Sequence, residues 1–200
     1  MKHSPAWKFA PVFCALLAAL PFSQARADGH TYYVAANGND SAAGTLDAPW
    51  RSIGRAARGV MPGDTVYVRG GTYNETIDVN TSGSAAAGPI VFASYPGEKA
   101  AVSGAGLAMP AGAMRGLWNL NNVSYVTVQG FDIGNYSTSS TSATPVGIYL
   151  NGGGTQVNIL GNRVHDIVGV KNEKLALANS MLESINSLAI QARTVTLLTD

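Results

Sequence analysis

VTVQGFDI (126–133) and VNILGNRV (157–164) are two short segments that match each other at an offset of 31 in the sequence numbering. The match aligns their apolar positions, their glycines and the ends of their strands. VYV (66–68) and IVF (90–92) fit the same role, at offsets of 24 and 36 from their successors. A flat sandwich would have closer and more uniform strand spacing. Repeats of this size predict an all-β solenoid of stacked coils.

Alternation along these strands predicts which side chains point inward. One set of apolar residues recurs at every second position and is expected to form the core. The predicted core residues are Val66, Val68, Ile90, Phe92, Val126, Val128, Ile148, Val157 and Ile159.

A short amphipathic helix is expected before the repeats, at about residues 52–60. Ser52 is a good N-cap, and Ile53, Ala56, Ala57 and Val60 follow at the spacing of one helix face. A solenoid needs a cover over its first coil, because its core and strand edges are otherwise exposed. We predict that this helix is the N-terminal cap.

The N-terminal segment up to Ala27 has the features of a secretory signal peptide. Lys2 and Lys8 flank its start, an apolar run covers 9–22, and ARA (25–27) is a small-x-small cleavage pattern. The run is too short to span a bilayer comfortably, which disfavours the alternative of a membrane anchor. We therefore predict a signal peptide at 1–27 and a secreted or periplasmic protein that is not held in a membrane.

The composition after Ala27 indicates one β-rich domain that does not bind nucleic acid. Cys14, the only cysteine, would leave with the signal peptide, so no disulfide is expected. Ten basic and 12 acidic residues would remain, a net charge of −2. Nucleic-acid binding requires a basic stripe, which this balance does not provide. About 173 residues are enough for one core, and we expect a monomer.

Several segments carry a resemblance to a known family. They are YYVA (32–35), NGND (37–40), GT (44–45), PWRSI (49–53), PGDTVYVRGGTY (62–73) and PIVFASYPGEK (89–99). Together they resemble the N-terminal part of secreted right-handed parallel β-helix polysaccharide lyases. The similar families are the pectate lyase family 9 type and the alginate lyase/chondroitinase B type. The resemblance extends from about Thr31 to Ile167.

The resemblance implies a right-handed parallel β-helix and β-elimination on an acidic, pectate-like polysaccharide. In these families clustered Asp or Glu residues on successive coils hold Ca²⁺, and a lysine, with an arginine in the alginate type, handles the proton. Asp132 and Asp166 lie about one coil apart and are the candidate metal ligands, although two carboxylates alone make a poor calcium site. The three lysines after the signal are Lys99 in a turn and Lys171 and Lys174 near the C-terminus.

The chain departs from the family pattern after Ile167. Residues 172–192 contain an apolar stripe at helical spacing and no glycine, which predicts an extra C-terminal helix. We therefore divide the chain into the signal peptide, the cap and first coils (28–168), and an atypical helical tail (169–200). The tail either covers the last coil or marks the chain as a fragment with a foreign end, such as a truncation or frameshift product.

Two pairs of residues are candidates for function. Arg163 and His165 share one face of a strand and could bind uronate or take part in catalysis, but a solvated outer face with Asp166 opening a turn is the preferred interpretation. Arg69 and Trp118 could bind sugar. The alternatives are that Arg69 holds the first loop against the cap and that Trp118 packs under the loop before Val126.

Two hypotheses about function follow. The first is a secreted β-helix protein of the polysaccharide lyase type that is incomplete or inactive as given, because a coil lysine and an acidic cluster are missing. The alternative is a non-catalytic carbohydrate-binding or surface-adhesion solenoid.

Overall fold

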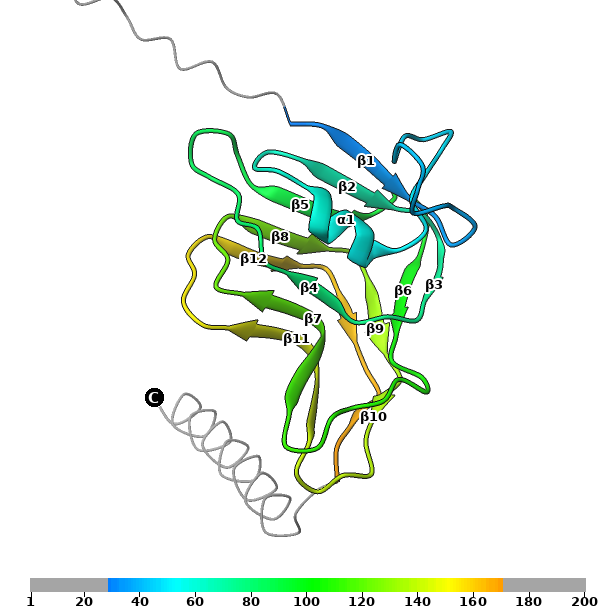
Figure 1. Ribbon diagram of the computed structural model, residues 1–200, viewed down its shortest axis with the longest axis vertical. Coiled ribbons are helices and arrows are strands. Elements are labelled where there is room, and N and C mark those ends of the chain that lie inside the picture. Colours follow the sequence, from blue (N-terminus) through cyan, green and yellow to red (C-terminus); the bar gives the residue numbers. More distant parts are fainter. Residues whose placement is uncertain (1–28, 171–200) are drawn as a thin grey trace, which may run out of the picture.

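The described part of the chain winds into stacked coils. The computed structural model describes residues 29–170 (Figure 1). The predicted signal peptide and nearly all of the predicted tail lie outside these residues. Within them, no helix is long and apolar enough to cross a bilayer.

Strands from successive coils form parallel sheets. The first sheet has the order β1 (Thr31–Val34), β2 (Thr65–Val68), β5 (Ile90–Ser94), β8 (Val126–Gln129) and β12 (Val157–Leu160). The second contains β3 (Gly71–Tyr73), β6 (Ala100–Ser103), β9 (Asp132–Gly134) and β13 (Arg163–Val164). The third contains β4 (Ile77–Val79), β7 (Met114–Asn121) and β11 (Thr144–Asn151), and β10 (Tyr136–Ser137) pairs with β14 (Ile167–Val168).

The strand registers confirm two of the three predicted offsets. Val126 pairs with Val157, and Ile90 pairs with Val126, as the longer two offsets require. The shortest offset was wrong, because Val66 pairs with Phe92 and not with Ile90. Ile90 and Phe92 lie on the same face of β5, so alternation alone cannot distinguish the two registers.

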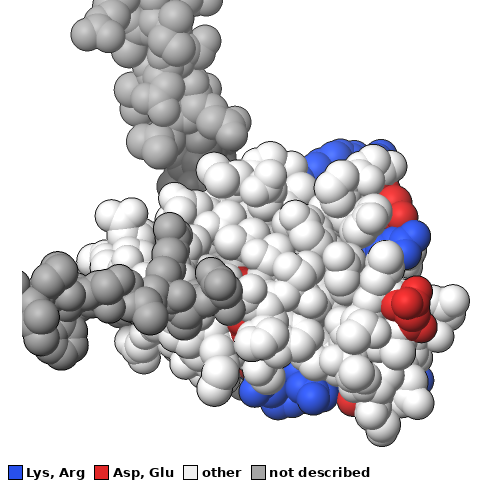
Figure 2. Space-filling view, turned by 90° about the horizontal axis from the view of Figure 1, so that it is seen from above, with Lys and Arg blue, Asp and Glu red and all other residues white. Residues whose placement is uncertain are grey.

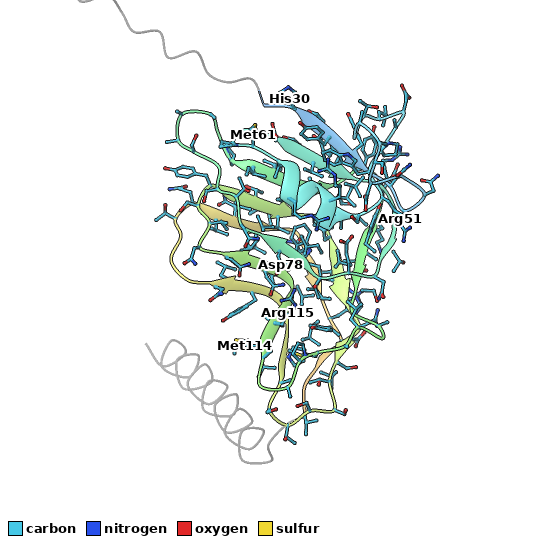
Figure 3. All side chains as sticks on the ribbon, viewed as in Figure 1. His30, Arg51, Met61, Asp78, Met114 and Arg115 are labelled. Carbon is cyan, nitrogen blue, oxygen red and sulfur yellow. The ribbon has the colours of Figure 1, made fainter. Side chains whose placement is uncertain are left out.

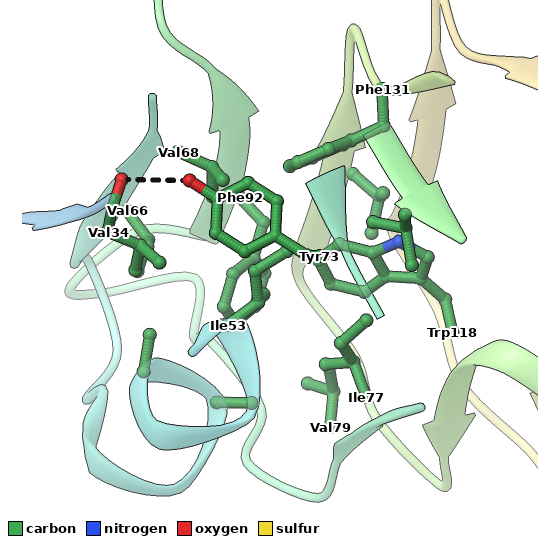
Figure 4. Close-up of a cluster of buried hydrophobic side chains, with 14 of the residues drawn as sticks. Val34, Ile53, Val66, Val68, Tyr73, Ile77, Val79, Phe92, Trp118 and Phe131 are labelled. Atoms are coloured by element: carbon green, nitrogen blue, oxygen red, sulfur yellow. Dashed lines mark hydrogen bonds between the residues drawn. The ribbon is translucent and has the colours of Figure 1, made fainter. Parts of the chain in front are cut away.

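The core fills the space between the sheets. Of the nine predicted core residues, the six on β2, β5 and β8 are fully buried. At the centre, the Trp118 ring packs against Phe92 and Phe131, with centroid distances of 5.4 and 5.1 Å (Figure 4). Near the cap, the buried hydroxyl of Tyr73 donates to the carbonyl of Val34 at 3.4 Å. Burial raises the pKa of Tyr73 to about 12.

The capping helix α1 (Ile53–Gly59) forms where the sequence predicted it. The Ser52 hydroxyl accepts from the backbone N–H of Arg55 at 3.2 Å, and the apolar face of the helix is buried against β4 and β1. Glu75, in the turn before β4, accepts from the N–H groups of Ile53 and Gly54 at 2.8 and 2.9 Å. Its carboxylate therefore ties the start of the helix to the first coil.

The last described coil exposes apolar side chains that earlier coils bury. Leu150, Ile159 and Val164 are 50%, 40% and 50% exposed. Their pairing partners one coil earlier are fully or almost fully buried: Leu120, Val128 and Ile133. This explains why the predicted core positions Ile159, Val157 and Ile148 are less buried than the rest.

Candidate functional site

Four of the six candidate residues meet on the outer face of the second sheet. Asp132 on β9 pairs in register with Arg163 on β13, so the side chains lie one above the other. His165 follows two residues after Arg163 on the same face, and Asp166 adopts a positive φ of 51° as the chain turns. The sequence had placed Arg163 and His165 on one face and Asp132 about one coil from Asp166, and the structure brings all four together.

His165 is held between two carboxylates. Its Nε2 lies 2.6 Å from Asp132 Oδ1, and its Nδ1 lies 2.7 Å from Asp166 Oδ2. The ring lies against Gly134, where an added Cβ would approach Cε1 to 2.7 Å. A glycine at position 134 therefore makes room for the imidazole.

The two contacts define the protonation state of His165. A neutral imidazole has one donor and one acceptor nitrogen, so one lone pair would face a carboxylate oxygen. Both contacts are favourable only when both nitrogens carry a proton. The hydrogen bond to Asp166, with a further one to Asp132, accordingly raises the pKa of His165, against an opposing desolvation. A doubly protonated ring has no lone pair with which to accept a proton, so the two carboxylates oppose a role of His165 as a general base.

Arg163 leaves part of its guanidinium open to solvent. Its Nη1 lies 3.3 Å from Asp132 Oδ2, and its side chain is 68% exposed. The remaining N–H groups can donate to a carboxylate in solution, including that of a uronate. The group as a whole has two cations and two anions, so it links neighbouring coils without a net charge.

Asp132 and Asp166, the candidate metal ligands, both contact His165. The two carboxylates bind opposite nitrogens of the same ring instead of converging on one point. Across residues 29–170, no group of three or more His, Cys, Asp and Glu side chains is arranged to hold a metal ion. Calcium takes six to eight oxygen ligands, so the described residues do not fit it.

Trp118 is fully buried and cannot stack on a sugar. It lies on β7, between the rings of Phe92 and Phe131. The structure therefore agrees with packing, although the residue sits in a strand and not under a loop.

Arg69 lies in the turn between β2 and β3 and pairs with Glu98 in a turn of the next coil, whereas the alternative interpretation expected it to hold the first loop against the cap. Its Nη2 lies 2.8 Å from Glu98 Oε1, and its guanidinium carbon lies 4.8 Å from the centre of the Tyr95 ring. The hydrogen bond from Arg69 lowers the pKa of Glu98, and the N–H of Gly70 adds to this effect. The pair borders a hollow of about 370 Å³ lined by residues 35–37, Arg69, Gly70 and Glu98.

Sequence reasoning missed the tyrosines beside Arg69. Tyr33 and Tyr67 pair in register on β1 and β2, and Tyr95 follows β5. The available signal was the tyrosine in the middle of VYV (66–68), because alternation directs it outward between two inward valines.

The sequence matches known proteins over most of its length. A family model described as "Pel9A-like, right handed beta helix region" matches residues 32–189. The chain is 32% identical over 174 residues to the uncharacterized protein YwoF of Bacillus subtilis, covering 84% of this chain and 37% of that protein. It is 41% identical over 106 residues to pectate lyase PEL9 of Emericella nidulans, covering 52% and 23%. The chain thus spans well under half the length of either relative.

Two solved structures share the fold. A rhamnogalacturonan lyase superposes with a TM-score of 0.54 at 24% identity, covering 70% of this chain and 36% of that one. The GH136 lacto-N-biosidase from Eubacterium ramulus superposes with a TM-score of 0.51 at 20% identity, covering 70% and 27%. The two are named as enzymes of different reaction types, so the shared fold does not select a reaction.

Proposed function

Because the chain belongs to the Pel9A-like right-handed β-helix family, we propose that it is an exported protein of the polysaccharide lyase type. Its substrate class in this proposal is an acidic, pectate-like polysaccharide, and its reaction is β-elimination. Residues 29–170 supply the cap and the first coils of the stack. In this proposal these residues do not supply the reacting groups, and we expect no turnover from them.

The observation that separates the described coils from the reacting groups in this proposal is the environment of His165. β-Elimination removes a proton from the sugar carbon next to a carboxylate, which requires a positioned base and neutralisation of that carboxylate. Both nitrogens of His165 are occupied by Asp132 and Asp166. Arg163 is too strongly protonated to serve as a base. The cationic groups of the site can bind a uronate but do not take its proton.

Activity assays test the proposal directly. The purified protein is incubated with polygalacturonate, alginate and chondroitin sulfate in the presence of Ca²⁺, and the ultraviolet absorbance of the unsaturated product is followed. We expect no turnover. Steady turnover that disappears in His165→Ala and persists in His30→Ala would contradict the proposal and make His165 the base.

Export is the second part of the proposal and has its own test. Small residues at Ala25 and Ala27 predict cleavage after Ala27. N-terminal sequencing of the protein recovered from the medium or periplasm should begin at Asp28. A start far from Asp28, or an uncleaved chain in the cytoplasm, would refute this part.

The second candidate function is a non-catalytic carbohydrate-binding solenoid. The hollow beside the Arg69–Glu98 pair favours it, because that hollow combines polar groups with an adjacent aromatic ring. Binding of a neutral polymer, without turnover of the acidic ones, would support this candidate.

A further inference from the structure

Three tyrosines form a cluster on the outer face of the first sheet. The ring centres of Tyr33 and Tyr67 lie 6.1 Å apart in a stacked arrangement, and Tyr95 lies 5.8 Å from Tyr67 and 6.3 Å from Tyr33. All three are partly exposed. We call this group the tyrosine platform.

The core does not require these rings. The neighbours of Tyr33 and Tyr67 along the strands are Val34, Val66 and Val68, and these point inward and are fully buried. In the same outward row, the next strands carry Ala93 and Gln129. The sheet therefore continues without an aromatic residue at this position. Aromatic side chains that cluster on a half-exposed surface are typical of binding sites.

Polar groups in fixed positions border the platform. Arg69 lies over the Tyr95 ring, and its Nε and Nη2 contact the Glu98 carboxylate at 2.8–3.0 Å. Both charged side chains line the hollow of about 370 Å³ described above. Figure 2 views the molecule from the end that carries β1 and shows positive and negative side chains interspersed around a mostly uncharged face.

We propose that the tyrosine platform and the Arg69–Glu98 pair bind the sugar rings of an uncharged polysaccharide. A pyranose ring has an apolar C–H face and a rim of hydroxyl groups. The faces of the tyrosine rings match the first, and the donors and acceptors of the ion pair match the second. Glu98 already neutralises Arg69 and would repel a uronate carboxylate, which selects a neutral chain over an acidic one.

This site is separate from the group of residues around His165, and its proposed role is to attach the protein to the neutral polysaccharide. It is built on β1, β2 and the turn that follows β5, whereas the acidic polymer is assigned to groups elsewhere in the protein. The two proposals can therefore fail independently, because one is measured as binding to neutral polymers and the other as turnover of acidic ones.

Affinity electrophoresis of the full chain tests the inference. The protein is run in native gels that contain galactan, xylan or polygalacturonate, and its retardation is compared with that in a plain gel. We expect retardation in a neutral polymer. Tyr67→Ala should weaken it about tenfold, the effect of losing one aromatic contact, while Tyr67→Phe should retain it. Tyr149→Ala, which removes a half-buried tyrosine from the third sheet, is the matched control.

Two safeguards keep the result decisive. Thermal melting shows whether Tyr67→Ala is folded, and Tyr95→Ala, located after the end of β5, replaces it if it is not. Absence of retardation in both neutral polymers would overturn the inference. So would equal weakening by Tyr67→Ala and Tyr149→Ala, or retardation in polygalacturonate alone.

Discussion

His165 illustrates how a single ring can be assigned a role by counting its hydrogen bonds. As a free side chain on a strand, it could be a base, a ligand or a solvated residue. Two carboxylate contacts at 2.6 and 2.7 Å favour the doubly protonated form. In this state it is an ionic link between coils, and Asp132 takes part in the same link through Arg163.

We expect the pKa of His165 in the folded protein to lie above the ordinary value for histidine. The folded state then binds the proton more tightly than the unfolded chain, so the link stabilises fully below the unfolded pKa. This contribution is lost as the pH rises through the folded-state pKa. An NMR titration of the ring protons measures the value, and Asp166→Asn should lower it. Asp47→Asn, an exposed and distant change, should not. A pKa unaffected by Asp166→Asn would contradict the assignment.

At the level of elements, the capping helix α1 depends on Glu75, which lies in the turn before β4. α1 has only seven residues and cannot be stable alone. Glu75 supplies acceptors for two of its first N–H groups, and these hydrogen bonds oppose the rise that burial causes in the pKa of Glu75. The helix and the first coil therefore stabilise each other.

Glu75→Gln should destabilise the protein by about 1–3 kcal/mol, because the amide NH2 would replace one of the two accepting oxygens and face a backbone N–H group. The matched control is Asp78→Asn, which makes the same chemical change in the same coil. Asp78 contacts Arg115 on β7 at 2.8 Å in a partly exposed ion pair, worth at most about 1 kcal/mol (Figure 3). Urea denaturation measures both. Equal losses in the two variants would show that Glu75 has no special role at the cap.

Sequence patterns predicted the strands whose apolar alternation is regular and missed several others, of which β7 is the longest. The strands at 66–68, 126–129 and 157–160 were found from their inward valines and isoleucines. The segment before Val126 was expected to be a loop, but β7 occupies it, with Gly116 and Asn119 interrupting its apolar pattern. In the structure, the Asn119 amide accepts from the N–H of Gly116 and donates to its carbonyl, so both polar groups are satisfied inside the sheet.

The candidate site was predictable only in part, for the same reason. Alternation places Arg163 and His165 together, and the repeat that aligns 126–133 with 157–164 places Asp132 beneath them. The protonation of His165 depends on distances that no pattern contains. The tyrosine platform required the register of β1 on β2 and the path of the turn after β5, neither of which is encoded locally.

The described molecule as a whole is a stack whose stability should vary along its axis. Coils in the middle have neighbours on both sides, whereas the last described coil exposes its inward side chains. In a solenoid, each coil contributes its own folding free energy and that of its interfaces with its neighbours.

The same substitution at equivalent positions of two coils should therefore have unequal effects. Val128→Asp places a carboxylate in a fully buried site and should abolish folding, because an unpaired buried charge costs several kcal/mol. Ile159→Asp, its partner one coil later, introduces the same charge at a side chain that is 40% exposed. Circular dichroism should show a folded Ile159→Asp variant and an unfolded Val128→Asp variant. Equal loss of structure would mean that the two coils are equivalently enclosed.

The N-terminal position of the cap also determines the order in which the coils can fold. The chain emerges amino end first, whether from a ribosome or a translocation channel, so α1 and the first coil are available before any later coil exists. Each strand of the first sheet from β5 onward pairs with the strand of the coil directly before it. Each new coil can thus pair with a coil that has already folded, and its folding does not require a segment that emerges later. The protein can therefore fold vectorially, one coil at a time, while the chain is still emerging.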